Sequence, residues 1–299
     1  MAWRLVSPMA STERLFCFGY GYAAAALARA VRARGWGVAG TCRTADKRAA
    51  LAAEGVEAFV FDREHPLPSG ALDGSTHVLV SIPPDELGDS ACDSHARDLL
   101  ALTSLRWLGY LSTTGVYGDH QGAWVDEASD LRARESRALK RIGTEEQWLA
   151  FWREARLPAH IFRLAGIYGP GRSALDAVRA GRAQRIVKPG QFFSRIHVAD
   201  IARALDASIG RPAPGAVYNL ADDEPSPPEA VVEHACALLG VTPPPAVPIE
   251  RATLSPMAAS FYKDNRRVRN ARLKAELDFS LLYPSYRDGL AAILAAERA

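Results

Sequence analysis

The sequence predicts an α/β fold, a doubly wound parallel sheet with helices on both faces and a smaller, discontinuous C-terminal lobe. Two observations predict it. Short apolar runs alternate with helix-period segments through the first half of the chain, and a glycine-rich turn separates the first run from the first helix. Strands that alternate with helices form βαβ units, whose strands lie parallel in one sheet.

The expected elements follow one another in this alternation. The apolar run RLFCF is a strand, and it precedes a helix that Gly35 ends before the strand VAGTC. ADKRAALAAEG predicts a helix and VEAFVF the next strand. HVLVSI and WLGYLST are strands on either side of a helix at about 89–104. A long helix from about 135 to 155 then leads to the strand AHIFRLA.

After GIYGPGR, at 166–172, the alternation weakens. A helix and a loop bounded by glycine and proline follow, RIHVADIARALDASI returns to a strand and a helix, and the remainder is mainly helical. The run TPPPAVP predicts a rigid connector. We therefore expect three parts: a flexible extension over 1–12, a nucleotide-binding Rossmann domain over 13–175 plus 195–220, and a substrate lobe over 176–194 plus 221–299.

Composition excludes several classes of protein. The 299 residues carry a formal net charge of +2, which gives no reason to expect a nucleic acid or a membrane surface as partner. The four cysteines have no metal-ligand spacing, and the N-terminal MAWRLVSPMASTER lacks the apolar core of a signal peptide. We expect a reduced, cytoplasmic protein without a metal site, whose partner is a small-molecule substrate.

The glycine-rich turn has the pattern Gly-x-Gly-x-x-Ala, formed by Gly19, Gly21 and Ala24. Gly19 would permit the tight turn, Gly21 would let the backbone approach a pyrophosphate, and Ala24 would allow close packing of helix on strand. The helix that follows presents N–H groups and its positive dipole end to phosphates. A plain tight turn is the alternative, but the strand before and the helix after favour dinucleotide binding.

The second strand favours NADP over NAD. An NAD site places Asp or Glu about 20 residues after the first glycine, where it accepts from the ribose 2′-hydroxyl. Here Arg43 lies 24 residues after Gly19, with Thr44 and Lys47 beside it, and a guanidinium can bind a 2′-phosphate. The alternative is a solvated arginine. Asp62 is placed to meet the adenine amino group, or else is an exposed loop residue.

Four motifs carry a resemblance to a known superfamily. YLSTTGVYGD, RLAGIYGPGR, RIHVADIARAL and VYNLADDE occur in this order between 110 and 224. The chain resembles, over roughly 13–290, the extended short-chain dehydrogenase/reductase superfamily, which includes the NAD-dependent epimerase/dehydratase family, and within it a bacterial branch.

The resemblance implies a role for particular residues. Thr113 falls on the position of the active-site hydroxyl that binds the substrate's reacting oxygen. The resemblance implies that the long helix pairs with its twin in a homodimer, although its apolar positions would also suit packing on the sheet. The resemblance also implies a cofactor site formed by Gly19, Gly21, Tyr22 and Ala23 at the pyrophosphate, Arg43 at the 2′-phosphate, Ser81, Ile82 and Pro83 at the adenosine ribose, and Leu164, Ala165, Ile167 and Tyr168 at the nicotinamide. Tyr20, Thr44 and Asp62 belong to the same expected site by their positions in the sequence.

The sequence departs from the superfamily at its proton donor. The usual Tyr-x-x-x-Lys pair, followed four residues later by Glu, has no counterpart in SRALKRIGTEEQW. With Glu145 as that Glu, Arg141 replaces the lysine and Arg137 the tyrosine. With Glu146 instead, Ile142 and Ser136 fall on those positions. An arginine stays protonated in proteins, so it cannot exchange the proton.

Three hypotheses follow. In the first, the protein is an NADP-dependent oxidoreductase or epimerase-like enzyme acting on a small polar substrate, with Tyr117 as the proton donor and His120 as a weaker candidate. Tyr117 could instead be a packing residue. In the second, the protein binds NADP without turnover, as a sensor or partner-binding protein. In the third, which is compatible with either, arginines bind an anionic or sugar-derived substrate.

Overall fold

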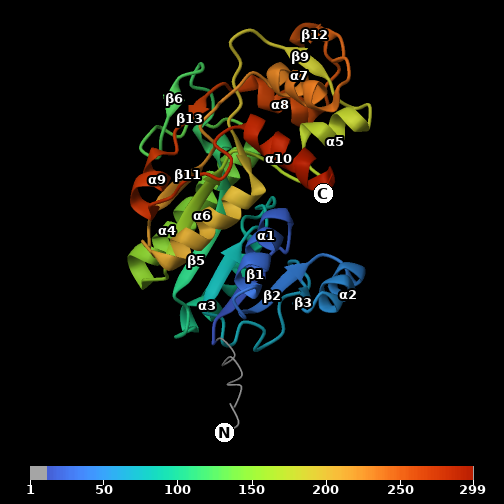
Figure 1. Ribbon diagram of the computed structural model, residues 1–299. Helices are drawn as coiled ribbons and strands as arrows, with labels where there is room; N and C mark the ends of the chain where they lie inside the picture. The colour runs from blue at the N-terminus through green and yellow to red at the C-terminus, as the bar shows by residue number, and fades with distance from the viewer. Residues whose placement is uncertain (1–11, 299) are drawn as a thin grey trace.

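The central sheet confirms the predicted fold class. The computed structural model describes residues 12–298, so nearly all of the expected extension over 1–12 lies outside the described residues. Its main sheet contains seven strands, β1 (Arg14–Phe18), β2 (Gly37–Cys42), β3 (Glu57–Val60), β4 (His77–Val80), β5 (Trp107–Thr113), β7 (Ala159–Leu164) and β11 (Val217–Leu220). All are parallel, in the order β11-β7-β5-β4-β1-β2-β3 (Figure 1).

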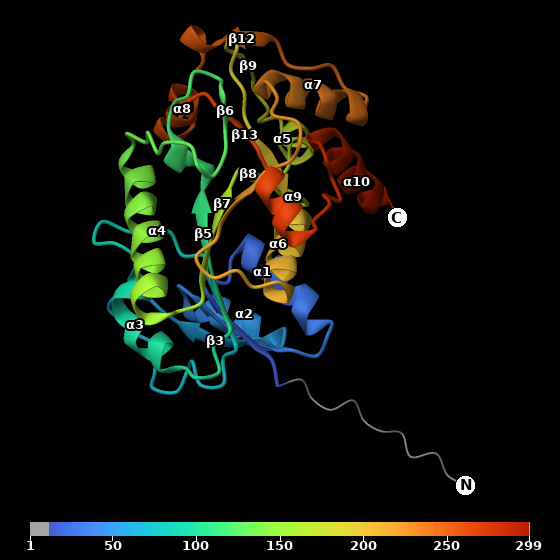
Figure 2. The ribbon, with the colours of Figure 1, turned by 90° about the vertical axis from the view of Figure 1, so that its left-hand side faces the viewer.

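Helices cover both faces of this sheet. They are α1 (Tyr22–Arg32), α2 (Ala45–Ala53), α3 (Ser90–Ala101), α4 (Ser136–Ala155) and α6 (Val198–Gly210). Figure 2 shows α3 and α4 on one side of β5 and α1 and α6 on the other. The two-residue period of β1 explains this: Leu15 and Cys17 pack in the apolar cluster with α1 and α6, whereas Phe16 and Phe18 pack with α3 and α4.

Local signals account for the helix boundaries. The Asp89 side chain accepts hydrogen bonds from the backbone N–H groups of Ala91 and Cys92, which starts α3 one residue after the predicted beginning. Gly35 follows the last turn of α1 with a φ of +83°, a left-handed conformation that glycine adopts without strain. None of the helices within 12–298 is long and apolar enough to span a bilayer.

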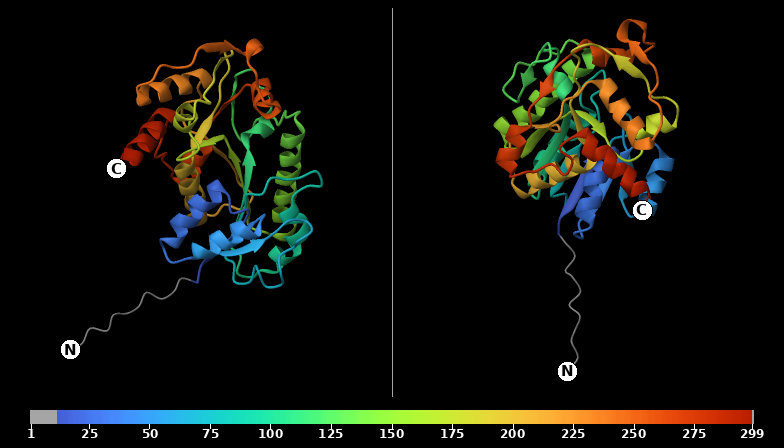
Figure 3. Two further views of the ribbon diagram at one scale, coloured as in Figure 1. Left: turned by 90° about the vertical axis from the view of Figure 1, so that its right-hand side faces the viewer. Right: turned by 45° about the horizontal axis from the view of Figure 1, so that its top comes forward.

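The rest of the chain forms a smaller region at the carboxyl edge of the sheet, the upper part of Figure 1 (further views in Figure 3). It contains the strand pairs β8 (Gly166–Tyr168) with β10 (Arg195–His197), β9 (Arg185–Val187) with β12 (Ala246–Pro248), and β6 (Trp124–Val125) with β13 (Arg267–Val268). Its helices are α5 (Ala174–Arg179), α7 (Pro228–Leu239), α8 (Pro256–Lys263) and α10 (Tyr286–Arg298). The helix α9 (Ala271–Leu277) returns to pack on α6 and β11, and short 3₁₀ helices cover Thr114–Tyr117 and Ile249–Arg251.

A separate apolar cluster supports this region. Tyr168, Leu175, Val231, Tyr286 and Leu290 are among its buried members, from β8, α5, α7 and α10. The run TPPPAVP, predicted as a connector, ends in β12, because an edge strand can accept prolines where their missing N–H groups are not needed. The domain boundaries themselves remain a prediction.

Candidate functional site

The turn between β1 and α1 depends on Gly19. Its φ is +86°, and its N–H donates to the Thr41 hydroxyl at 2.7 Å, while its carbonyl accepts from the Ser81 hydroxyl at 2.5 Å. A Cβ atom at this position would lie 2.9 Å from both Ser81 Oγ and Ile82 Cγ1. The turn therefore needs glycine for its backbone angle and for the space that β4 leaves.

Gly21 serves a different purpose. It is the N-cap of α1, and no side chain among the described residues caps this end of the helix. A Cβ atom at Gly21 would meet nothing within 4 Å. The opening above Gly21 thus lets a ligand approach the first N–H groups of an 11-residue helix, where the dipole favours a phosphate.

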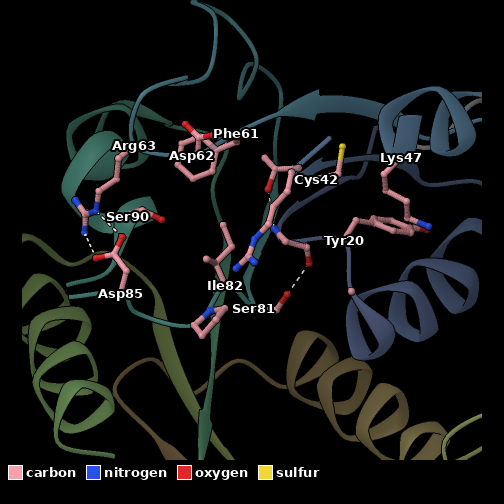
Figure 4. Close-up of a pocket in the computed structure, with 15 residues that line it drawn as sticks. Tyr20, Cys42, Lys47, Phe61, Asp62, Arg63, Ser81, Ile82, Asp85 and Ser90 are labelled. Carbon is pink, nitrogen blue, oxygen red and sulfur yellow. Dashed lines mark hydrogen bonds and ion pairs between the residues drawn. The ribbon is translucent and has the colours of Figure 1, made fainter. Parts of the chain in front are cut away.

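A pocket of about 500 Å³ opens beside this turn, at the carboxyl ends of β1, β2, β3 and β4 (Figure 4). Ligands of open α/β sheets bind at this edge, where the strand order reverses, here between β1 and β4. The pocket is lined by Gly19, Tyr20, Gly21, Thr41, Cys42, Arg43, Lys47, Phe61, Asp62, Arg63, Ser81, Ile82, Pro83, Asp85 and Ser90.

The positively charged side chains around this pocket differ in whether they have an ion-pair partner. Arg63 is bound by the Asp85 carboxylate at 2.6 Å and by that of Asp93 at 2.7 Å. Arg43 and Lys47, both exposed, form no ion pair with any described residue. Figure 4 shows Lys47 across the pocket from Arg63 and Asp85. The free positive charge therefore lies beyond the end of β2, where the second strand of a dinucleotide site meets the ribose.

Eight of the predicted cofactor residues line the pocket: Gly19, Tyr20, Gly21, Arg43, Asp62, Ser81, Ile82 and Pro83. The Asp62 carboxylate also accepts from the backbone N–H groups of Glu64 and His65, so one of its oxygens is occupied by the local turn. Thr44 lies outside the lining, because its hydroxyl caps α2 by accepting from the Lys47 backbone N–H at 3.2 Å.

The other predicted cofactor residues also lie outside the pocket lining: Tyr22, Ala23, Leu164, Ala165, Ile167 and Tyr168. Leu164 and Ala165 are buried where β7 ends, and the Tyr168 hydroxyl donates to the Ser285 carbonyl oxygen at 3.2 Å. Sequence reasoning missed Phe61 and the Arg63–Asp85 pair. Phe61 ends an apolar run and could have been inferred, whereas no spacing links Arg63 to a loop 22 residues away.

Thr113 and Tyr117 lie in different environments. Thr113 is half-buried where β5 ends, and its oxygen accepts from the Gly115 N–H at 3.0 Å, so its own proton stays free to donate. Tyr117 is fully buried. Its hydroxyl donates to Asn219 Oδ1 at 2.7 Å and accepts from Arg163 Nη1 at 3.0 Å, and burial raises the pKa of its phenol. This geometry favours the packing interpretation of Tyr117.

The helix α4 contains Arg137 and Arg141, which the sequence predicts at the positions of the usual tyrosine and lysine, and Lys140 between them. Arg141 points inward, donating to the Leu111 carbonyl oxygen and, at 3.1 Å, to the Tyr110 hydroxyl. Arg137 is exposed. Lys140 turns toward the loop after β4, where it pairs with Glu86 at 2.5 Å. His120, the weaker candidate, lies 3.2 Å from the Asp130 carbonyl oxygen.

Asp222, from the VYNLADDE motif, has an unusual environment and gives a prediction. It is 1% exposed, its Oδ2 atom has no hydrogen-bond partner among the described residues, and burial raises the pKa of its carboxyl to about 8. Between about pH 4 and pH 8 the native protein therefore binds a proton that the unfolded chain releases. This group's contribution to stability is complete at low pH and is lost as the pH rises through that window.

We expect the unfolding free energy of Asp222→Asn to vary with pH less than that of wild type, by a few kcal/mol. The reason is that each unit of pKa displacement corresponds to about 1.4 kcal/mol. Urea unfolding of wild type and variant between pH 5 and pH 8.5 measures it, and the difference between their unfolding free energies should widen in favour of the variant as the pH rises. A constant difference across this range would contradict the prediction. Taking the difference cancels the opposite effect of His160, whose pKa burial lowers to about 4.

Fold and pocket together define a Rossmann-type protein with a pocket at the carboxyl edge of its central sheet. A family model described as the NAD dependent epimerase/dehydratase family matches residues 97–221. The protein YeeZ of Escherichia coli strain K12 is 27% identical over 260 residues, which cover 78% of this chain and 86% of YeeZ. The chain is therefore similar to the NAD-dependent epimerase/dehydratase family, an NAD(P)-dependent group.

Solved structures share this fold. A functionally unknown conserved protein from Silicibacter pomeroyi DSS is 49% identical, with a TM-score of 0.87 over 96% of this chain and 99% of the other. UDP-glucuronic acid 4-epimerase from Bacillus cereus, in complex with NAD, is 15% identical, with a TM-score of 0.73 over 96% of this chain and 100% of the other. At that identity the second likeness concerns the fold alone.

Proposed function

We propose that this protein is an NADP(H)-dependent oxidoreductase or epimerase-like enzyme that acts in the cytoplasm on a small polar substrate. One observation carries the choice of NADP. Arg43 and Lys47 are unpaired among the described residues at the rim of the pocket, beyond the end of β2, where an NAD site needs a carboxylate. A 2′-phosphate would supply the missing negative charge.

The residues present fit such a cofactor. The opening above Gly21 admits a pyrophosphate to the start of α1, and Ser81, Ile82 and Pro83 border the space beside the adenosine ribose. When bound, the nicotinamide would supply hydride transfer. Thr113 would bind the reacting oxygen of the substrate, since its hydroxyl proton is free. Arg141 stays charged, so it would act as a donor to the substrate or the cofactor and not as an acid or base.

We expect Arg43→Ala to weaken NADPH binding roughly 10- to 100-fold, because charge-assisted hydrogen bonds to a phosphate contribute about 1.5–3 kcal/mol. NADH has no 2′-phosphate, so its affinity should change less than about threefold. Titrations followed by nicotinamide fluorescence measure both constants. Arg48→Ala, an exposed arginine on α2 outside the pocket lining, is the matched control. Equal losses for both cofactors would contradict the assignment of Arg43.

A second candidate function rests on Tyr117. Its hydroxyl is bonded to Asn219 and Arg163 inside the protein, and α4 has no tyrosine. An intact cofactor pocket beside a site without a proton donor suits a protein that binds NADP without turnover, as a sensor or a partner-binding protein. With NADPH bound, absorbance at 340 nm separates the two: oxidation with an aldehyde, ketone or sugar nucleotide supports the enzyme, and tight binding without oxidation across such a panel supports the silent protein.

A further inference from the structure

The side chain of Tyr22 crosses from the start of α1 to the loop between β8 and α5. Its hydroxyl donates to the Pro170 carbonyl oxygen at 2.9 Å. Gly169 makes room for this contact: a Cβ atom there would lie 2.4 Å from the Tyr22 hydroxyl and 2.6 Å from Val198 Cγ1. This hydrogen bond therefore connects the glycine-rich turn to a loop about 148 residues later in the chain.

That loop is a closed turn with a defined shape. The N–H of Gly169 donates to the Arg172 carbonyl oxygen at 3.2 Å, and the N–H of Arg172 donates back to the Gly169 carbonyl oxygen at 3.0 Å. Gly171, between them, has a φ of +71°. The chain then enters α5 through a capping box formed by Ser173 and Asp176. Both ends of the turn are therefore fixed, and the Arg172 side chain extends from a rigid base.

Arg172 is a cation without an anion. Its guanidinium carbon lies 5.9 Å from the centre of the Tyr22 ring, and the residue is exposed. It forms no ion pair with any residue between 12 and 298. Tyr22 is the first residue of α1, where the proposed pyrophosphate site begins. The ring that Arg172 lies over therefore belongs to a residue of that site.

We propose that Arg172 binds the cofactor pyrophosphate, and that the turn 169–172, fastened by Tyr22, is the second wall of this site. The inference rests on the proposed function, because it assumes a dinucleotide at Gly21. Neither arginine of the pocket lining is available to bind the pyrophosphate. Arg43 lies at the adenosine end, and Arg63 is neutralised by Asp85 and Asp93. The backbone N–H groups of α1 would otherwise meet both phosphate charges alone.

The test uses two ligands that differ in the pyrophosphate. NADPH contains the pyrophosphate and the 2′-phosphate, whereas adenosine 2′-phosphate contains only the latter. We expect Arg172→Ala to raise the Kd of NADPH about tenfold or more in calorimetric titrations, and to leave that of adenosine 2′-phosphate unchanged. Arg43→Ala should weaken both ligands. Arg182→Ala is the control, because Arg182 is exposed just after α5 and forms no ion pair with a described residue.

A second variant tests the hydrogen bond between Tyr22 and the turn 169–172. Tyr22→Phe keeps the ring under Arg172 and removes only the hydrogen bond to Pro170. We expect it to speed NADPH dissociation several-fold in stopped-flow experiments, with the melting temperature and the affinity for adenosine 2′-phosphate retained. Arg172→Lys should recover part of the NADPH affinity, because it restores a charge without the planar fork.

The possible outcomes distinguish the proposed role of Arg172 from the proposed binding of the cofactor. If Arg172→Ala binds NADPH as Arg182→Ala does, while Arg43→Ala loses it, the cofactor assignment stands and the role of Arg172 is overturned. Equal weakening of both ligands by Arg172→Ala overturns that role as well, because the effect would not depend on the pyrophosphate. A wild-type protein that binds neither ligand overturns both proposals.

Discussion

Gly19→Ala should destabilise the protein by roughly 2–4 kcal/mol, since it combines a strained left-handed backbone with overpacking. The φ of +86° disfavours any side chain, and the added carbon would lie 2.9 Å from Ser81 Oγ and 3.2 Å from the Ile82 backbone nitrogen. Ser81 cannot turn aside freely, because its hydroxyl donates to the Gly19 carbonyl oxygen. Urea unfolding followed by circular dichroism measures the loss.

Gly21→Val is the matched comparison, two residues away. Nothing lies within 4 Å of a Cβ atom at Gly21, and its φ of −95° is ordinary for any residue. We expect its free energy of unfolding to stay within about 1 kcal/mol of wild type, whereas NADPH binding should fall at least a hundredfold, because the side chain would occupy the opening. Comparable losses of stability in the two variants would show that the glycines share one structural role.

The main sheet could be predicted because its signals are local. RLFCF, VAGTC and HVLVSI are long enough to show burial on both faces, and the glycine turn and Asp89 mark where helices begin. The pairs β6 with β13 and β9 with β12 could not. Strands of two or three residues have too few positions to show alternation, and their partners lie far apart in the sequence.

The same distinction holds at the candidate site. Gly19, Gly21 and Arg43 follow from spacing along one βαβ unit, and all three line the pocket. The surroundings of Tyr117 depend on Arg163 and Asn219, which come from two other strands. No pattern in TTGVYGD tells a buried hydroxyl with two internal partners from one that faces a substrate. Chemistry at the end of a strand is therefore harder to predict than cofactor binding at the start of a helix.

The second prediction with a large expected effect concerns the buried ion pair between Glu145 and Arg163. Arg163 Nη2 lies 2.8 Å from Glu145 Oε2, and the two side chains are 6% and 3% exposed. Glu145 also accepts from the Ser112 hydroxyl, and Arg163 donates to the Tyr117 hydroxyl. We expect Glu145→Ala to cost about 3–5 kcal/mol in unfolding free energy, because it leaves a guanidinium buried without its counter-charge. A loss below 1 kcal/mol in chemical denaturation would contradict this.

The double variant Glu145→Leu with Arg163→Met distinguishes pairing from packing. Apolar replacements of similar volume remove both charges, so we expect most of the stability lost in Glu145→Ala to return. This pair gives Glu145 a structural role that does not depend on a tyrosine eight residues earlier. Glu145 is required by a buried arginine on β7, whereas Arg137, which takes the tyrosine position in that register, is exposed. Replacing a buried partner is costly, but an exposed position can change with little effect on the fold.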